Sequence, residues 1–92
     1  MTSAKIWQLE MTKEADKDLA RLDKLIKQRI IDFFEDRVLP QENPRLFGKA
    51  LTGRLNGYWR YRVGDYRIIA KIQDHRLTIL AISIDHRSRV YN

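Results

Sequence analysis

The chain has 92 residues and a mass of 11.0 kDa, which suits one domain spanning residues 1–92. Its hydrophobic fraction is 43% and its charged fraction 33%, typical of a folded globular protein and not of a disordered one. The sequence contains no cysteine, which excludes disulfides and thiolate metal sites. We see no signal-peptide pattern, and the longest uncharged apolar run, residues 77–84, is far too short to span a bilayer. These features predict a cytoplasmic protein.

The positive charge is concentrated in the second half of the chain. The net charge is +6. Residues 1–46 contain nine Lys/Arg and nine Asp/Glu, whereas residues 47–92 contain nine Lys/Arg and three Asp. Seven of those nine cations are arginines, whose planar fork donates paired hydrogen bonds to phosphate. A one-sided basic field of this kind is typical of proteins that bind nucleic acid, although a solvated basic surface gives the same count.

The first half of the chain predicts one strand and two helices. Residues 4–11 alternate imperfectly and are predicted as a strand. Thr12 is a suitable helix N-cap, and apolar residues recur at helical spacing over residues 13–22. Asp23 can cap a second helix, whose apolar stripe continues until Pro40 ends it. We expect these helices to pair as an antiparallel hairpin.

The second half predicts three strands after a connection rich in Pro, Asn and Gly. Gly64-Asp65 has the composition of a two-residue type II′ hairpin turn. The expected segments are a connection at 40–57, strands at 58–63, 66–72 and 77–84, and a basic tail at 85–92. The order β-α-α-β-β-β predicts an α+β fold, with the helix hairpin packed on a mostly antiparallel four-stranded sheet.

The two-residue turn determines which side chains share a face of the hairpin. It pairs Val63 with Tyr66, so alternation puts Arg60, Arg62 and Arg67 on one face. Aromatic and aliphatic side chains occupy the other face, which is suited to packing on the helices. Arg62 opposite Arg67 is a like-charge pair that folding does not favour. We expect an anion to bridge the two; the alternative is that the side chains splay into solvent or meet acidic residues of the first half.

The tail adds groups that can transfer protons. His86 titrates near neutrality in its unperturbed state, whereas Tyr91 would need cationic neighbours before it could act as a base. By themselves these two residues do not establish a catalytic site. Other motifs fail: the glycine-rich stretch at 48–53 lacks the Lys-Ser/Thr of a P-loop, and neither histidine has metal-ligand spacing.

The run from Gly48 to Ile69, which includes Trp-Arg-Tyr-Arg-Val-Gly-Asp-Tyr-Arg, resembles the RelE branch of the RelE/ParE toxin superfamily. The ending His86-Arg87-Ser88-Arg89-Val90-Tyr91 resembles it as well. The resemblance implies a toxin of a type II toxin–antitoxin pair, blocked by a cognate antitoxin protein. It also implies a metal-independent endoribonuclease without a cofactor, which cuts mRNA in the ribosomal A site. The RNA's own 2′-hydroxyl would be the nucleophile, leaving a 2′,3′-cyclic phosphate.

The resemblance also implies roles for individual residues. Arg62 and Arg67 would hold the scissile phosphate, and Arg60 would orient the 2′-hydroxyl. Arg87 would stabilise the leaving 5′-oxygen, and Tyr91 would accept the hydroxyl proton. His86 is an alternative acid or base, because arginine is a poor proton donor near neutral pH. Further contacts to RNA are expected from Lys49, Arg54, Lys71 and Arg89.

Two other functions are compatible with the same fold. A ParE-like protein would inhibit DNA gyrase without enzymatic activity, and the arginine cluster with its His-Arg-Tyr tail has no evident purpose in such a protein. A plain RNA-binding module would bind with salt sensitivity and not cleave. We therefore expect the nuclease, with the gyrase inhibitor as the alternative.

Overall fold

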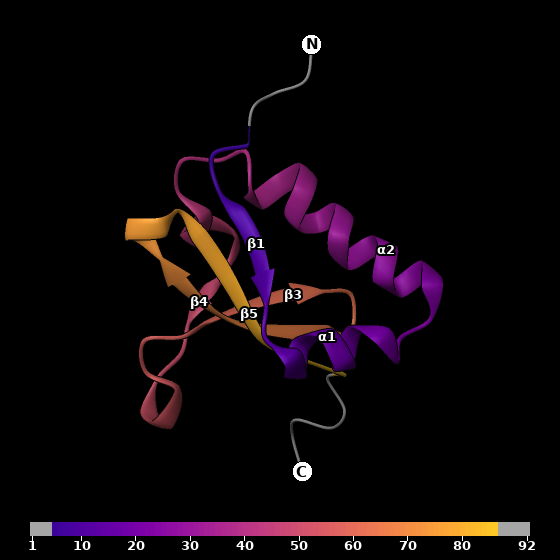
Figure 1. The fold of residues 1–92 in the computed structure, drawn as a ribbon. Helices are drawn as coiled ribbons and strands as arrows, with labels where there is room; N and C mark the ends of the chain where they lie inside the picture. The colour runs from indigo at the N-terminus through magenta and orange to yellow at the C-terminus, as the bar shows by residue number, and fades with distance from the viewer. Residues whose placement is uncertain (1–4, 87–92) are drawn as a thin grey trace.

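The computed structural model describes residues 5–86, and Figure 1 shows how the elements are arranged. The helices and strands are β1 Gln8–Met11, α1 Lys13–Ala20, α2 Lys24–Phe33, β2 Lys49–Ala50, β3 Trp59–Val63, β4 Tyr66–Gln73 and β5 Thr78–His86. Single turns of π- or 3-10 helix lie at Phe34–Val38, Pro44–Phe47, Gly53–Leu55 and Asp74–Arg76. Among the described residues, no helix has the length and apolar character needed to cross a membrane.

The sheet confirms the expected α+β class and has one more strand than expected. Its strand order is β1-β5-β4-β3-β2, with β1 parallel to β5 and every other neighbouring pair antiparallel. The additional strand is β2, two residues inside the connection that was predicted to be a loop. Lys49 pairs with Arg60 there, and Ala50 pairs with Trp59.

Both helices cover the same face of the sheet (Figure 1). α1 lies against β5 and β1, and α2 lies against β3. Their apolar stripes are directed mainly at the sheet, where Leu19, Leu22 and Ile26 pack on the buried core. Neither α1 nor α2 covers the opposite face, so strand side chains on that face are available to a partner.

Backbone hydrogen bonds explain where the first strand begins. The sequence predicted a strand from residue 4, but the amides of Ile6 and Trp7 both donate to the carbonyl of Leu39 at 2.9 Å. Those amides therefore do not pair with β5, and the β1–β5 ladder begins at Gln8. The Trp7 side chain is buried, and its indole N–H donates to the carbonyl of Glu42 at 3.2 Å.

Thr12 links the first helix to the last strand. As predicted, it is the N-cap of α1, and its hydroxyl accepts from the amide of Ala15 at 3.1 Å. The same hydroxyl donates to the carbonyl of Ile82 at 3.0 Å, and the Thr12 amide donates to the carbonyl of Ala81 at 3.0 Å. One residue thus ends β1, starts α1 and binds β5.

The β3–β4 hairpin has the register that the turn predicted. Val63 pairs with Tyr66, Arg62 with Arg67 and Arg60 with Ile69. Gly64 has a φ of +59° and Asp65 has a negative φ, which agrees with a type II′ turn.

Tyr61 is the largest fully buried side chain and joins three parts of the chain. Its ring lies edge-on to Phe34 from the second helical segment, with centroids 5.1 Å apart. Its hydroxyl donates to the carbonyl of Pro44 at 2.9 Å. Burial raises the pKa of the Tyr61 phenol well above its ordinary value, so this tyrosine stays protonated and cannot be a catalytic base.

The last strand, β5, begins and ends later than the predicted strand at 77–84. Leu77 adopts a left-handed conformation with a φ of +48°, so the strand starts at Thr78. Asp85 and His86, predicted to belong to the tail, are the last two residues of the strand and pair with Arg67 and Tyr66. Strand alternation therefore controls the direction of both side chains.

Removing the Tyr61 hydroxyl should measure its role as an anchor. In Tyr61→Phe the buried Pro44 carbonyl loses its donor, so the free energy of unfolding should fall by about 1–3 kcal/mol. Urea denaturation followed by circular dichroism checks this. Tyr58→Phe, at a half-buried tyrosine with no hydrogen bond through its hydroxyl among the described residues, should change stability by less than about 0.5 kcal/mol. Equal effects of the two substitutions would contradict the anchoring role.

Acid should weaken one contact between the connection and the β4–β5 turn. Arg45 donates two hydrogen bonds to Asp74, at 3.0 and 2.7 Å, and they hold the pKa of the Asp74 carboxyl below its ordinary value. The stabilisation is therefore present above about pH 4 and is lost as the pH falls through the folded-state pKa. Asp74→Asn should reduce the acid-induced fall in Tm, whereas Asp65→Asn, at an exposed turn carboxyl, should not.

Candidate functional site

Five cations lie on the sheet face that the helices leave open. They are contributed by three neighbouring strands, and we call them the basic face: Lys49 of β2, Arg60 and Arg62 of β3, and Arg67 and Lys71 of β4. Alternation from the buried Tyr61 and Ile68 assigns them to this side. The structure therefore brings together five of the residues that the sequence predicted for phosphate and RNA contacts.

Arg62 and Arg67 are directly opposite each other next to the turn. The adjacent Val63–Tyr66 pair closes the two-residue turn, so Arg62 and Arg67 form the closer type of pair, with Cα atoms about 4.5 Å apart. Guanidinium groups that approach within about 4 Å repel each other by about 1 kcal/mol even in a water-like dielectric. A bound phosphate would replace this repulsion with two charge-assisted hydrogen bonds.

Arg60 is half-buried in the middle of the basic face, between Lys49 and Ile69 in neighbouring strands. Its Nε is buried and has no hydrogen-bond partner in the structure. A buried donor without an acceptor is costly, and such groups are over-represented at functional sites. Arg60 thus offers a hydrogen-bond donor on this face that no acceptor in the described structure satisfies.

An apolar hollow of about 390 Å³ lies next to Arg67. Its apolar walls are formed by Leu55, Tyr58, Ile69 and Ile82, and we call the space between them the apolar hollow. Arg54, Arg67 and Asp85 also border it. Arg54 comes from the 3-10 turn Gly53–Leu55, so the structure places this predicted RNA contact beside the basic face.

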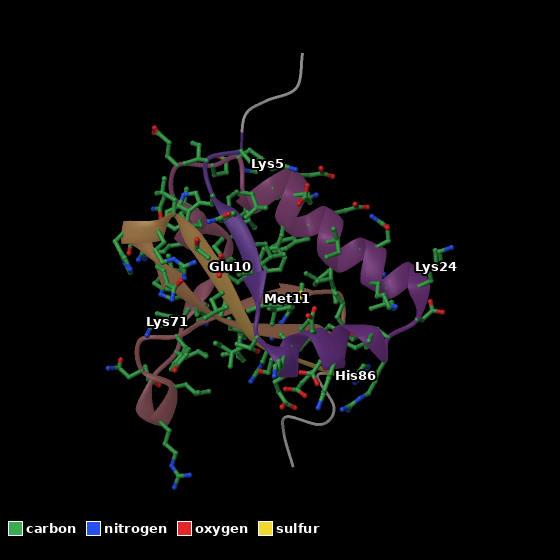
Figure 2. All side chains as sticks on the ribbon, in the orientation of Figure 1. Lys5, Glu10, Met11, Lys24, Lys71 and His86 are labelled. Atoms are coloured by element: carbon green, nitrogen blue, oxygen red, sulfur yellow. The ribbon has the colours of Figure 1, made fainter. Side chains whose placement is uncertain are left out.

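His86 lies on the other side of the sheet from the basic face. It pairs with Tyr66 across β4 and β5, and the two rings are edge-to-face with centroids 5.1 Å apart. It borders a hollow of about 310 Å³ together with Asp18 and Arg21 of α1. Figure 2 shows His86 close to α1 and Lys71 on the side away from the helices. The geometry therefore separates His86 from Arg60, Arg62 and Arg67.

Three predicted residues, Arg87, Arg89 and Tyr91, lie outside the described part of the chain. Within residues 5–86 there is no cluster of three or more His, Cys, Asp or Glu side chains suited to hold a metal ion.

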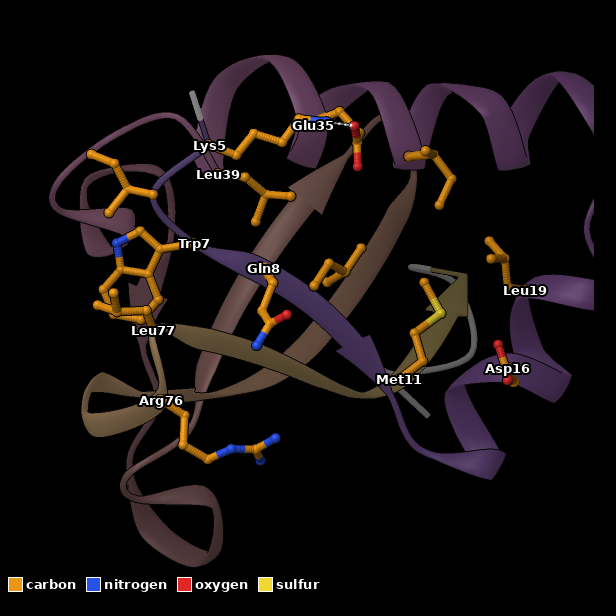
Figure 3. Close-up of a pocket in the computed structure, with 13 residues that line it drawn as sticks. Lys5, Trp7, Gln8, Met11, Asp16, Leu19, Glu35, Leu39, Arg76 and Leu77 are labelled. Atoms are coloured by element: carbon orange, nitrogen blue, oxygen red, sulfur yellow. Dashed lines mark hydrogen bonds and ion pairs between the residues drawn. The ribbon is translucent and has the colours of Figure 1, made fainter. Parts of the chain in front are cut away.

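Another hollow, of about 910 Å³, runs beside β1 at the edge of the sheet (Figure 3). Apolar side chains such as Met11, Leu19 and Leu39 form part of its lining, and its charged residues come in both signs. Lys5 is ion-paired with Glu35, and Arg76 with Glu10 at 3.0 Å. Because these charges compensate each other, this hollow lacks the excess of positive charge that marks the basic face.

Sequence reasoning missed the residues of the apolar hollow. Ile69 and Ile82 belong to apolar runs and were assigned to strands, with no indication that they would face away from the helices together. Leu55 lies in the segment that was predicted as a connection. A leucine within the polar, turn-forming run Arg-Leu-Asn-Gly, shortly before the arginine-bearing strand, is the sequence signal that could have located the hollow. The structure shows that this leucine is exposed.

Comparison with known proteins identifies the family. Residues 9–91 match the family described as ParE toxin of type II toxin-antitoxin system, parDE. The chain belongs to the RelE/ParE family of type II toxins. It is 33% identical to Toxin RelG of Mycobacterium tuberculosis over 90% of this chain and 93% of that protein. Toxin RelE of the same organism is 33% identical over 92% of this chain and 86% of that protein.

A solved structure supports the same assignment. The toxin–antitoxin complex RelBE2 from Mycobacterium tuberculosis contains a chain that aligns with a TM-score of 0.80 and 28% identity. The alignment covers 89% of this chain and 92% of that chain. The resemblance noted in the sequence is thereby confirmed.

The basic face should dominate the salt dependence of RNA binding. Removing one cation that binds a phosphate should make the slope of log K against log salt shallower by about 0.7 for a single strand. Arg62→Ala and Lys49→Ala should each show this change, measured by fluorescence anisotropy of a labelled single-stranded RNA across a range of NaCl. Lys24→Ala, at an exposed position on α2 remote from this face (Figure 2), should leave the slope unchanged. Similar slopes for all three variants would exclude the basic face as the RNA-binding surface.

Proposed function

We propose that this toxin is a metal-independent endoribonuclease that cuts mRNA in the ribosomal A site and so inhibits translation in the cytoplasm. The observation that supports this most is the arrangement of Arg60, Arg62 and Arg67 on one open sheet face. Two of these arginines are directly opposite each other on neighbouring strands, and the third holds a buried, unpartnered donor.

The proposed reaction uses the substrate's own 2′-hydroxyl. Its oxygen attacks the adjacent phosphorus as the bond to the leaving 5′-oxygen breaks, and a 2′,3′-cyclic phosphate forms. Arg62 and Arg67 bind the non-bridging oxygens and offset the negative charge that builds up on them. Arg60 donates to the hydroxyl or the phosphate and orients the attack.

The remaining two roles fall on the tail. Tyr91 accepts the proton of the 2′-hydroxyl. Arg87 stabilises the negative charge on the 5′-oxygen as it leaves, and this oxygen takes up a proton from solvent water. The position of His86 beside α1 argues for this assignment over one in which His86 transfers the proton.

We propose a cognate antitoxin as the regulating partner, because the structural relative described above is a toxin–antitoxin complex. An acidic or amphipathic segment would cover the basic face and exclude mRNA from it. Disordered segments that fold on binding are well suited to covering such a surface.

The alternative is inhibition of DNA gyrase, which the family description as a ParE toxin favours. That activity predicts gyrase-dependent DNA breaks and intact mRNA. The cluster on the basic face favours RNA cleavage, and one experiment separates the two activities.

The decisive test is primer extension on ribosomes programmed with a defined A-site codon. The wild-type chain should cut there, and Arg67→Ala should slow cleavage by at least about 100-fold, since it removes an electrostatic contact made in the transition state. Arg87→Ala and Tyr91→Phe should also be strongly impaired, whereas His86→Gln should retain most activity. Lys24→Ala is the matched control.

Three results would change the proposal. Cleavage that survives Arg87→Ala and Tyr91→Phe but not His86→Gln would reassign the proton transfers. Absence of cleavage by a folded chain would overturn the nuclease. Gyrase-dependent DNA breaks in a parallel supercoiling assay would establish the alternative.

A further inference from the structure

We propose that the apolar hollow is a subsite for the base of an RNA nucleotide whose phosphate is bound by Arg54 and Arg67. The inference rests on the proposed action on RNA and adds a residue-level prediction of base preference to it.

The apolar hollow is separate from the hydrophobic core. Ile69 is 8% exposed, yet it is not part of the cluster of buried residues that joins the helices to the sheet. It pairs with Arg60 and Ser83 in the neighbouring strands, so it points to the open face. Its cover comes from Leu55 and Tyr58 at the end of the connection, which leave a space and not a packed contact.

A β-bulge places Ile82 in the same wall. Ile69 pairs with Ser83 but the next residue, Ala70, pairs with Ala81, so Ile82 is the additional residue in β5. A bulge places two neighbouring side chains on the same side of the strand, and Ile82 and Ser83 both border the hollow. Thr12 holds this irregularity through its bonds to the carbonyls of Ala81 and Ile82.

The size and lining of the hollow suit a base. Its volume of about 390 Å³ lies in the range of small-ligand pockets. Aromatic and aliphatic walls favour the flat, apolar faces of a nucleobase, and Tyr58 supplies a ring for stacking. Leu55 is 43% exposed, so its side chain is accessible to a ligand in the hollow.

The charges at the hollow define the ligand further. Arg54 and Arg67 favour an anionic phosphate at the mouth. Asp85 is the acid in the lining, and a carboxylate accepts hydrogen bonds from an exocyclic amino group such as N4 of cytosine. Uracil presents a carbonyl oxygen at the same position and would be repelled. The subsite should therefore prefer cytosine to uracil, two bases of equal shape.

Titration of the isotope-labelled chain with nucleotides, followed by NMR, tests this directly. The probes are cytidine 5′-monophosphate, uridine 5′-monophosphate and ribose 5-phosphate. We expect the cytidine nucleotide to shift the methyl signals of Ile69 and Ile82 and to bind at least about threefold more tightly than the uridine nucleotide. Ribose 5-phosphate should shift signals near Arg54 and Arg67 and leave the two isoleucines unchanged.

Two pairs of variants assign the effect. Leu55→Ala should lower the affinity for the cytidine nucleotide by about tenfold, since the substitution removes part of a hydrophobic wall. Leu25→Ala, at a 74% exposed leucine on α2, should not change it. Asp85→Asn should bring the cytidine-to-uridine affinity ratio close to one, because the amide can donate to the uracil oxygen. Asp65→Asn should preserve the ratio.

Three outcomes would overturn the inference. Equal isoleucine shifts with ribose 5-phosphate would show a simple anion site. No nucleotide-dependent shifts, together with shifts on adding antitoxin, would make the hollow a protein interface. An unchanged ratio in Asp85→Asn would remove the assigned specificity. These readouts need no ribosome, so the two proposals can fail separately. Base binding without A-site cleavage would overturn only the proposed nuclease. A-site cleavage without base-dependent shifts would overturn only the base subsite.

Discussion

The burial of Tyr61 is the constraint on which the rest of the molecule depends. Its ring packs against Phe33 and Phe34, and its hydroxyl satisfies the Pro44 carbonyl, so β3 has one permitted orientation against the helices. Strand alternation then turns the neighbours Arg60 and Arg62 to the open face. Reversing β3 would bury two guanidinium groups among apolar side chains, at a cost no available contact would offset. The core thus dictates the position of the charges.

The same logic connects stability with the repulsion on the basic face. The chain places Arg62 opposite Arg67 and leaves a buried Nε of Arg60 without an acceptor, although each feature weakens the folded state. The hairpin tolerates them because its register is determined elsewhere, by the turn at Gly64 and by the buried side of the strands. We propose that a bound phosphate relieves both costs at once.

Thr12 contacts the bulge that contributes Ile82 to the apolar hollow on the open face. By capping α1 and binding two carbonyls of β5, it couples the start of the helical layer to the bulge that redirects Ile82. Basic and apolar elements therefore adjoin on one surface: arginines for a phosphate and an apolar hollow beside them. The edge of the sheet at β1, with its compensated charges, is a chemically different surface on the same small protein.

Much of the candidate site could be predicted from the sequence, because it depends on local rules. A Gly-Asp turn determines the hairpin register, and period-two alternation then groups Arg60, Arg62 and Arg67 without knowledge of the fold. What only the tertiary structure decided depends on contacts between distant segments. The bulge at Ile82 exists because Thr12, 70 residues earlier, binds it, and the hollow exists because the Leu55 segment folds back over Ile69. The position of His86 beside α1 follows from two additional residues of strand pairing with β4, which no pattern in the sequence specified.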